Sequence, residues 1–215
     1  MVLGFPHNPT ACTGEQAWLD EAMHRSVQHD LVLAHDNPYV DLALEGDAPS
    51  LLRCPHWRER GIEFFSLSKG WCLGGFRLAF AVGAVPLISA LRQLKGVVDF
   101  NQCQALQRGA VVALDQHADW PSRLLPVYRH RRDRMRQALA DLGWIVPMPS
   151  MALYLWMPIP EWASAKGWSD EQLAAELLEH CGVALTPGSG FGDAGRGWLR
   201  LALVRPVEDL ENAVA

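Results

Sequence analysis

The chain has 215 residues, of which 49% are hydrophobic and 20% are charged. This balance excludes a disordered or fibrous protein, and the length is sufficient for one large domain or two small ones. A net charge of -5 gives the protein no general attraction for nucleic acid or anionic lipid, so we expect its ligands to be small molecules.

Five scattered cysteines show no C-x-x-C pair and no spacing typical of a disulfide framework or a zinc site, which favours a reducing cytoplasm. They are Cys12, Cys54, Cys72, Cys103 and Cys181. No apolar run approaches the length of a bilayer span, so we expect no membrane anchor. The first residues already have the pattern of a strand, and we therefore expect a natural N-terminal lead-in to be absent.

Strand-like and helical patterns alternate in the first part of the chain. Apolar runs predict strands over residues 1–5, 31–35, 62–67 and 78–82, and a helical pattern covers residues 15–29. This alternation is typical of an α/β fold with a mostly parallel sheet, which binds ligands at the carboxyl ends of its strands. One or two helices over residues 86–117 complete a predicted first domain at residues 1–120.

The remaining residues predict a smaller α+β domain over residues 121–215. A helix over residues 122–142 is expected to end at Gly143, and a second helix begins at Ser169, with Gln172 three residues on as in a capping box. Gly182 is the expected end of that second helix. Strands are expected near residues 144–146, 152–157 and 198–204 and near Val183.

The segment from Ser66 to Arg77 contains the most informative group of polar side chains. Lys69 follows a predicted buried strand, the hydroxyls of Ser66 and Ser68 precede it, and a glycine-rich loop leads from it to Arg77. A lysine amine in a desolvated site can form a Schiff base with an aldehyde, while hydroxyls and a guanidinium can bind a phosphate. Taken alone, Ser-x-Ser-Lys is more often a surface turn.

Polar residues also follow two other predicted strands. Asp36 could hold a pyridine nitrogen protonated, which makes the ring an electron sink, and Tyr39 could donate to a phenolic oxygen of that ring. Asn8, in His7-Asn8-Pro9-Thr10, could reach the same oxygen with its amide. Each motif is also compatible with an ordinary turn.

Asn-Pro-Thr, Asp-x-x-Tyr and Ser-x-Ser-Lys followed by an arginine, in this order, resemble the class I aminotransferases of PLP fold type I. The resemblance continues through Thr186-Pro187-Gly188 to Trp198-Leu199-Arg200 and covers essentially the whole chain. It is closest to the subgroup of alanine and LL-diaminopimelate aminotransferases, through residues 63–69 and 150–156. Ala11 departs from the glycine that many members have after Asn-Pro-Thr, and residues 72–75 form a variable loop.

The resemblance implies a pyridoxal 5′-phosphate (PLP) cofactor carried by Lys69 and the transfer of an amino group between an amino acid and a 2-oxo acid. It implies a large domain that binds PLP at residues 1–120 and a small domain at residues 121–215. It also implies that Arg200 binds the substrate α-carboxylate and that members pair as homodimers. The cofactor contacts that it implies come from Asn8, Asp36, Tyr39, Ser66, Ser68, Lys69 and Arg77.

Complete members of this class are much longer than this chain and have further strands, a glycine-rich phosphate cup and an aromatic residue that stacks on the cofactor ring. We therefore expect a truncated chain whose activity on its own is in question. The alternative is a non-catalytic fragment or a binding module derived from the aminotransferase fold.

Two other motif matches indicate different chemistry and are disfavoured by their context. Ser66-x-x-Lys69 matches the serine–lysine nucleophile of penicillin-binding enzymes, but the chain contains neither Ser-Asp-Asn nor Lys-Thr-Gly. The glycines at residues 190, 192 and 195 match G-x-G-x-x-G, but a predicted strand follows them where a dinucleotide site needs a helix.

A cluster of arginines lies in the predicted helix over residues 122–142. Its members are Arg129, Arg131, Arg132, Arg134 and Arg136. The cluster includes an aspartate and belongs to an acidic protein, so we interpret it as a solvated helix face and not as a nucleic-acid surface.

Overall fold

The computed structural model describes residues 1–214, which form two compact units. The first unit comprises Met1–Pro6 and Thr13–Leu124. The second comprises His7–Cys12 and the described residues from Leu125 onward. The short segment that contains Asn8 therefore packs with the second unit, although it lies in the sequence between two strands of the first.

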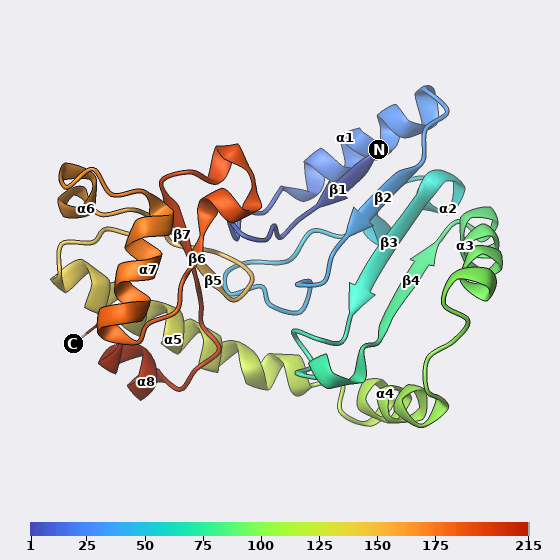
Figure 1. The fold of residues 1–215 in the computed structure, drawn as a ribbon. Coiled ribbons are helices and arrows are strands. Elements are labelled where there is room, and N and C mark those ends of the chain that lie inside the picture. The colour runs from blue at the N-terminus through green and yellow to red at the C-terminus, as the bar shows by residue number, and fades with distance from the viewer. Residues whose placement is uncertain (215) are drawn as a thin grey trace. The chain divides into compact units, whose positions relative to one another are not determined.

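A four-stranded sheet forms the centre of the first unit (Figure 1). In spatial order it consists of β1 (Val2–Gly4), β2 (Leu33–Asp36), β3 (Gly61–Ser66) and β4 (Ala79–Gly83). The first three strands are parallel and β4 is antiparallel to β3. The predicted α/β fold with a mostly parallel sheet is thus confirmed, and every strand expected in this part lies within two residues of its predicted ends.

Helices pack against this sheet, and the spacing of apolar residues in α1 shows which of its faces makes the contact. In α1 (Gln16–Gln28), Leu19 and Met23 lie four residues apart and so share one helix face, which packs with Leu33 of β2. The segment predicted to form one or two helices forms two, α3 (Val85–Val98) and α4 (Gln104–Gln116). The short helices of this unit are α2 (Trp57–Arg60) and the 3₁₀ turns at Leu51–Arg53 and Gly74–Phe76.

The second unit contains a three-stranded antiparallel sheet in the order β5 (Tyr154–Pro158), β7 (Trp198–Ala202), β6 (Thr186–Pro187). The long helix α5 (Trp120–Asp141) begins in the first unit and continues into this one. The other helices of the second unit are α6 (Glu161–Ala165), α7 (Asp170–Cys181), α8 (Val207–Asn212) and the 3₁₀ turns at Gly188–Phe191 and Asp193–Gly195.

The predicted start and end of α7 are both confirmed. The Ser169 hydroxyl accepts a hydrogen bond from the Gln172 backbone N–H at 3.2 Å, and the Gln172 side chain accepts one from the Ser169 N–H at 3.1 Å. Gly182 follows the last turn with a φ of 69°, a left-handed conformation that suits glycine.

The strand predicted at residues 144–146 is wrong. These residues, all within the described part of the chain, form no strand, although buried Trp144 and Val146 flank exposed Ile145 as in a strand. The Val146 carbonyl instead accepts two hydrogen bonds from the Arg136 guanidinium, at 2.9 and 3.0 Å. The strand expected near Val183 is also displaced, because β6 begins at Thr186.

The interpretation of the arginine cluster as a solvated helix face agrees with Arg134, whose side chain is 55% exposed, but is wrong for Arg132. Arg132 is only 3% exposed and donates to the Pro149 carbonyl at 3.1 Å. Arg131 donates to the Leu203 carbonyl at 3.1 Å. Together with Arg136, these side chains donate to backbone carbonyls of irregular segments that have no strand partner. These hydrogen bonds connect α5 to the irregular segments of the second unit.

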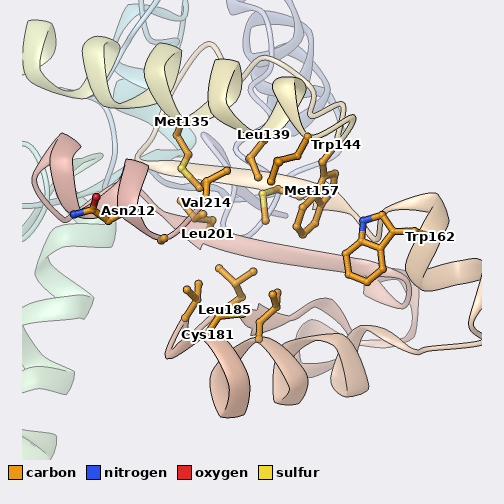
Figure 2. A pocket seen from close by; sticks show the side chains of 14 residues that line it. Met135, Leu139, Trp144, Met157, Trp162, Cys181, Leu185, Leu201, Asn212 and Val214 are labelled. Atoms are coloured by element: carbon orange, nitrogen blue, oxygen red, sulfur yellow. The ribbon is translucent and has the colours of Figure 1, made fainter.

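The second unit also contains an apolar pocket of about 430 Å³ (Figure 2). Met135 and Leu139 of α5, Met157 of β5 and Trp162 of α6 contribute to its lining. None of the site residues predicted from the sequence lines it, so it is not the candidate functional site. No helix within residues 1–214 is long and apolar enough to cross a membrane.

Candidate functional site

The candidate site in the first unit lies at the carboxyl edge of the parallel strands. Gly4, Asp36 and Phe64 are register partners across β1, β2 and β3, and Ser66 ends β3 two residues later. Asp36 is therefore at the same edge of the sheet as the segment that carries Lys69. This is the edge at which open α/β sheets bind their ligands.

The loop between β3 and β4, residues 67–78, is closed by its own backbone. The Leu67 N–H donates to the Leu78 carbonyl at 3.3 Å, and the Leu73 N–H donates to the Leu67 carbonyl at 3.0 Å. Inside this loop the Lys69 carbonyl accepts from the Cys72 N–H at 3.1 Å. Lys69 therefore lies in a tight turn, with its side chain half-buried.

Side-chain contacts of the loop explain its orientation. Leu67 and Leu78 pack with Ala110 of α4, which directs them into the core. The Ser66 hydroxyl accepts from the Ser68 N–H at 3.2 Å, so both hydroxyl residues belong to the same turn before the lysine. Arg77, at the other end, is exposed and donates to the Gly74 carbonyl at 3.1 Å.

Asp41 packs against the turn that carries Lys69 and stabilises it. The Trp71 indole N–H donates to the Asp41 carboxylate at 3.0 Å, and a Cβ placed on Gly70 would lie 2.4 Å from the Asp41 Cβ. Burial raises the pKa of Asp41, and the hydrogen bond from Trp71 opposes that rise. Asp41 follows buried Tyr39 by two residues, so this contact also connects the turn to the segment after β2.

Replacing Gly70 by alanine is expected to shift the Lys69 turn and destabilise the fold by about 1–3 kcal/mol, because the added methyl group overlaps Asp41. Gly75→Ala is the matched control, since a Cβ at Gly75, in the same loop, meets nothing within 4 Å. Urea unfolding of both variants measures the difference. Equal stability of the Gly70→Ala and Gly75→Ala proteins would contradict the tight packing at Gly70.

The second unit holds the other two predicted site residues, Asn8 and Arg200, in direct contact. Arg200 Nη1 donates to the Asn8 side-chain oxygen at 2.6 Å, and Arg200 Nη2 donates to the Thr186 hydroxyl at 3.2 Å. The guanidinium carbon lies 4.6 Å from the ring centroid of Tyr154 and 4.9 Å from that of Phe191. These contacts fix the plane of the guanidinium.

One nitrogen of that guanidinium has no hydrogen-bond partner among residues 1–214. Arg200 Nε is buried and makes no hydrogen bond to any described residue. A buried N–H group without an acceptor is costly, and the Nε edge of a guanidinium matches a carboxylate. Arg200 Nε is therefore an unsatisfied donor in this cluster.

The loop that carries Phe191 is held at both ends by Asp170, at the start of α7. The Asp170 carboxylate accepts from the Ser189 N–H at 2.8 Å and from the Gly197 N–H at 3.1 Å. Burial alone would raise the pKa of Asp170, but these hydrogen bonds outweigh it and hold the pKa below its usual value. Asp170 thus orders the loop whose aromatic ring lies against Arg200.

The lowered pKa of Asp170 predicts a pH dependence of stability. The anionic form stabilises the folded state above the carboxyl group's usual value of 3.8, and this contribution is lost as the pH falls through the lower, folded-state pKa. We expect Asp170→Asn to cost about 1–3 kcal/mol at neutral pH and progressively less below about pH 4.

Urea unfolding between neutral and acid pH checks this expectation. Asp193→Asn is the control, because that side chain is 92% exposed in the same loop. A stability difference between wild type and Asp170→Asn that stays constant with pH would contradict the role given to the Asp170 carboxylate.

Several residues of these sites were missed by the sequence prediction. Asp41 and Trp71 gave no signal, because their pairing depends on how two loops fold. Tyr154 and Phe191 belong to segments that were recognised, but their stacking on Arg200 becomes visible only in three dimensions.

The first unit is thus an α/β unit with an amine, a carboxylate and hydroxyls at the carboxyl edge of its parallel strands, and the second unit contains an arginine with an unsatisfied buried nitrogen. The family model for class I and II aminotransferases matches residues 1–215. The chain therefore belongs to this family.

Individual relatives cover the whole chain. It is 39% identical over 214 residues to an LL-diaminopimelate aminotransferase of Dehalococcoides mccartyi, an alignment that covers 99% of the chain and 54% of the relative. It is 35% identical over 215 residues to the glutamate-pyruvate aminotransferase AlaC of Escherichia coli, with 100% and 52% covered. The chain thus spans about half the length of the curated relatives that it matches.

Solved structures agree with this family. A probable N-succinyldiaminopimelate aminotransferase from Thermus thermophilus superposes with a TM-score of 0.89 at 42% identity, covering 99% of this chain and 56% of that one. Substrate-bound BacF of Bacillus subtilis superposes with a TM-score of 0.92 at 30% identity, covering 100% and 54%.

Proposed function

We propose that this chain contributes the cofactor-binding lysine and the carboxylate-binding arginine of a PLP-dependent aminotransferase, which transfers an amino group between an amino acid and a 2-oxo acid. The observation that carries the proposal is the position of Lys69, in a tight turn after β3 and at the same sheet edge as Asp36. Membership in the aminotransferase family supports it independently. In this proposal residues 1–120 are the PLP-binding domain and residues 121–215 the small domain.

The donor set at that edge fits PLP. An amine suits its aldehyde, a carboxylate suits its pyridine nitrogen, and the hydroxyls of Ser66 and Ser68 with the Arg77 guanidinium suit its phosphate. Tyr39 and the amide of Asn8 are the proposed donors to the ring oxygen. When bound, PLP supplies an aldehyde that condenses with amines and a ring that withdraws electrons from the attached carbon.

Each of these residues would then have a distinct role in the reaction. Asp36 holds the proton on the ring nitrogen, and Arg200 binds and orients the substrate α-carboxylate. Lys69 would hold the cofactor through its amine, and its Nζ, when free, would take the proton from the substrate Cα. The same residues run the second half-reaction in reverse with a 2-oxo acid, so the kinetics should be ping-pong.

The substrate is proposed from the names of the relatives. They include LL-diaminopimelate aminotransferases and a glutamate-pyruvate aminotransferase, which supports an alanine–glutamate or a diaminopimelate-type reaction. We place this reaction in the reducing cytoplasm, which the five free cysteines support.

Covalent trapping of the cofactor tests the proposed function. The chain has three lysines, Lys69, Lys95 and Lys166. We expect the protein to develop a visible absorption band with PLP, and borohydride reduction followed by digestion and mass spectrometry to place the phosphopyridoxyl group on Lys69. No band, or equal labelling of the three lysines, would favour a non-catalytic fragment or binding module.

We also propose, from the resemblance to the family, that the protein forms a homodimer. Exposed apolar side chains on α3 support association with another chain, since Val85 is 80% and Val97 76% exposed. Sedimentation velocity over a range of concentrations should detect the dimer, and a monomer throughout that range would contradict it.

A further inference from the structure

The first unit contains a buried pair of ionisable side chains to which the proposed function gives no role. His35 of β2 and Glu63 of β3 are register partners, and both side chains are 0% exposed. His35 Nδ1 lies 3.0 Å from Glu63 Oε1. Buried ionisable groups are costly unless they are fully paired, so their other contacts decide what the pair can do.

The Glu63 carboxylate has a partner on every side. Oε1 also accepts from the Asn37 amide at 2.8 Å, while Oε2 accepts from the Ser50 hydroxyl at 2.7 Å and from the Leu52 N–H at 3.2 Å. Burial would raise the pKa of Glu63, but the hydrogen bonds from His35, Asn37 and Ser50 outweigh it and hold the pKa below its usual value. The carboxylate is therefore ionised at neutral pH and can only accept hydrogen bonds.

The opposite ring nitrogen of His35 faces a second obligate acceptor. Nε2 lies 2.8 Å from the Phe5 carbonyl oxygen, which has no hydrogen to give. Nδ1 thus faces a carboxylate and Nε2 a carbonyl, and both of these groups only accept hydrogen bonds. The ring of His35 therefore connects Glu63 to the Phe5 carbonyl within the buried network.

This pair lies at the ends of the strands that carry the candidate site. His35 contacts both the Phe5 carbonyl, directly after β1, and Glu63 in β3. Asn37 also contacts Glu63, so the residues on either side of Asp36 are both held by the network. The Asn37 amide also reaches the Pro49 carbonyl at 3.0 Å. Side chains alternate along a strand, so buried His35 lies on one face of the sheet and exposed Asp36 on the other.

We propose that Glu63 and His35 are positioning residues that fix Asp36 from the opposite face of the sheet, so that its carboxylate is held in place for the PLP ring nitrogen. This rests on the proposed function. The network anchors the residues immediately before and after Asp36 and leaves its carboxylate on the ligand side.

A double-mutant cycle separates positioning from general stability. Glu63→Gln keeps the shape of the side chain but removes its charge, and we expect it to weaken PLP binding about tenfold in the wild-type background. In an Asp36→Ala background the same change should have almost no further effect, because the residue through which it acts is gone. Glu59→Gln, on the exposed surface of α2, is the control and should leave PLP affinity unchanged.

The outcomes distinguish the two proposals. Equal losses from Glu63→Gln in both backgrounds would overturn the positioning role while PLP binding by the wild type stands. A wild type that binds no PLP would instead overturn the proposed function, and the positioning role with it. If thermal melting shows that Glu63→Gln does not fold, Ser50→Ala, which removes one donor to Glu63, replaces it in the cycle.

The buried contact has a readout that does not depend on the cofactor. Nitrogen-15 NMR of the histidine side chains should show a His35 signal that is lost in His35→Gln and shifted in Glu63→Gln, because Glu63 contacts its Nδ1. A His35 signal that is unchanged in Glu63→Gln would overturn the contact on which the positioning role rests.

Discussion

Lys69→Ala is expected to reduce transamination by at least about 10²-fold, because it removes both the amine that carries PLP and the proposed acceptor of the substrate Cα proton. Steady-state assays with paired amino acids and 2-oxo acids, alanine and glutamate among them, measure the loss. The turn should survive the change, since the Lys69 contact that closes it comes from the backbone carbonyl and not from the side chain. The unfolding midpoint should therefore change little.

The other two lysines provide the controls for this prediction. Lys95 pairs with Asp99 within α3 at 2.7 Å, and Lys166 lies 4.5 Å from the ring centroid of Trp168. Neither belongs to the candidate site, so Lys95→Ala and Lys166→Ala should keep wild-type rates. Wild-type activity in Lys69→Ala would remove the basis for the proposed chemistry.

The regular parts of the fold could be predicted from the sequence because their signals are local. The alternation of apolar strands with an amphipathic helix located β1 to β4 and α1, and the capping box at Ser169 located the start of α7. The order of motifs after successive strands likewise placed Asp36 and Lys69 at one sheet edge, because parallel strands present their carboxyl ends together.

Predictions failed where a long side chain replaced a local interaction. The pattern of residues 144–146 is that of a strand, but Arg136 supplies the hydrogen bonds that a neighbouring strand would otherwise make. At Glu63, in contrast, the sequence gives a signal but does not identify the interaction partners. A carboxylate inside an apolar strand signals a buried network, but its donors come from two segments, residues 35–37 and 50–52, that no local pattern connects.

Arg200→Ala is expected to raise KM for the amino-acid substrate about 10- to 150-fold, with a smaller change in kcat. One hydrogen bond between charged groups contributes about 1.5–3 kcal/mol, and each 1.36 kcal/mol corresponds to a tenfold change. The loss should fall on binding because the carboxylate of the substrate does not itself react. Initial rates over a range of amino-acid concentrations measure both constants.

Two further variants separate the shape of the guanidinium from its charge. Arg200→Lys keeps the positive charge but loses the planar fork and the stacking between Tyr154 and Phe191, so its KM should lie between those of the wild type and Arg200→Ala. Arg196→Ala, which removes an exposed arginine paired with Asp193, should leave KM unchanged. If Arg196→Ala and Arg200→Ala raised KM equally, the effect would reflect general positive charge near the loop, and the buried, unpartnered Nε of Arg200 would lose its assigned ligand.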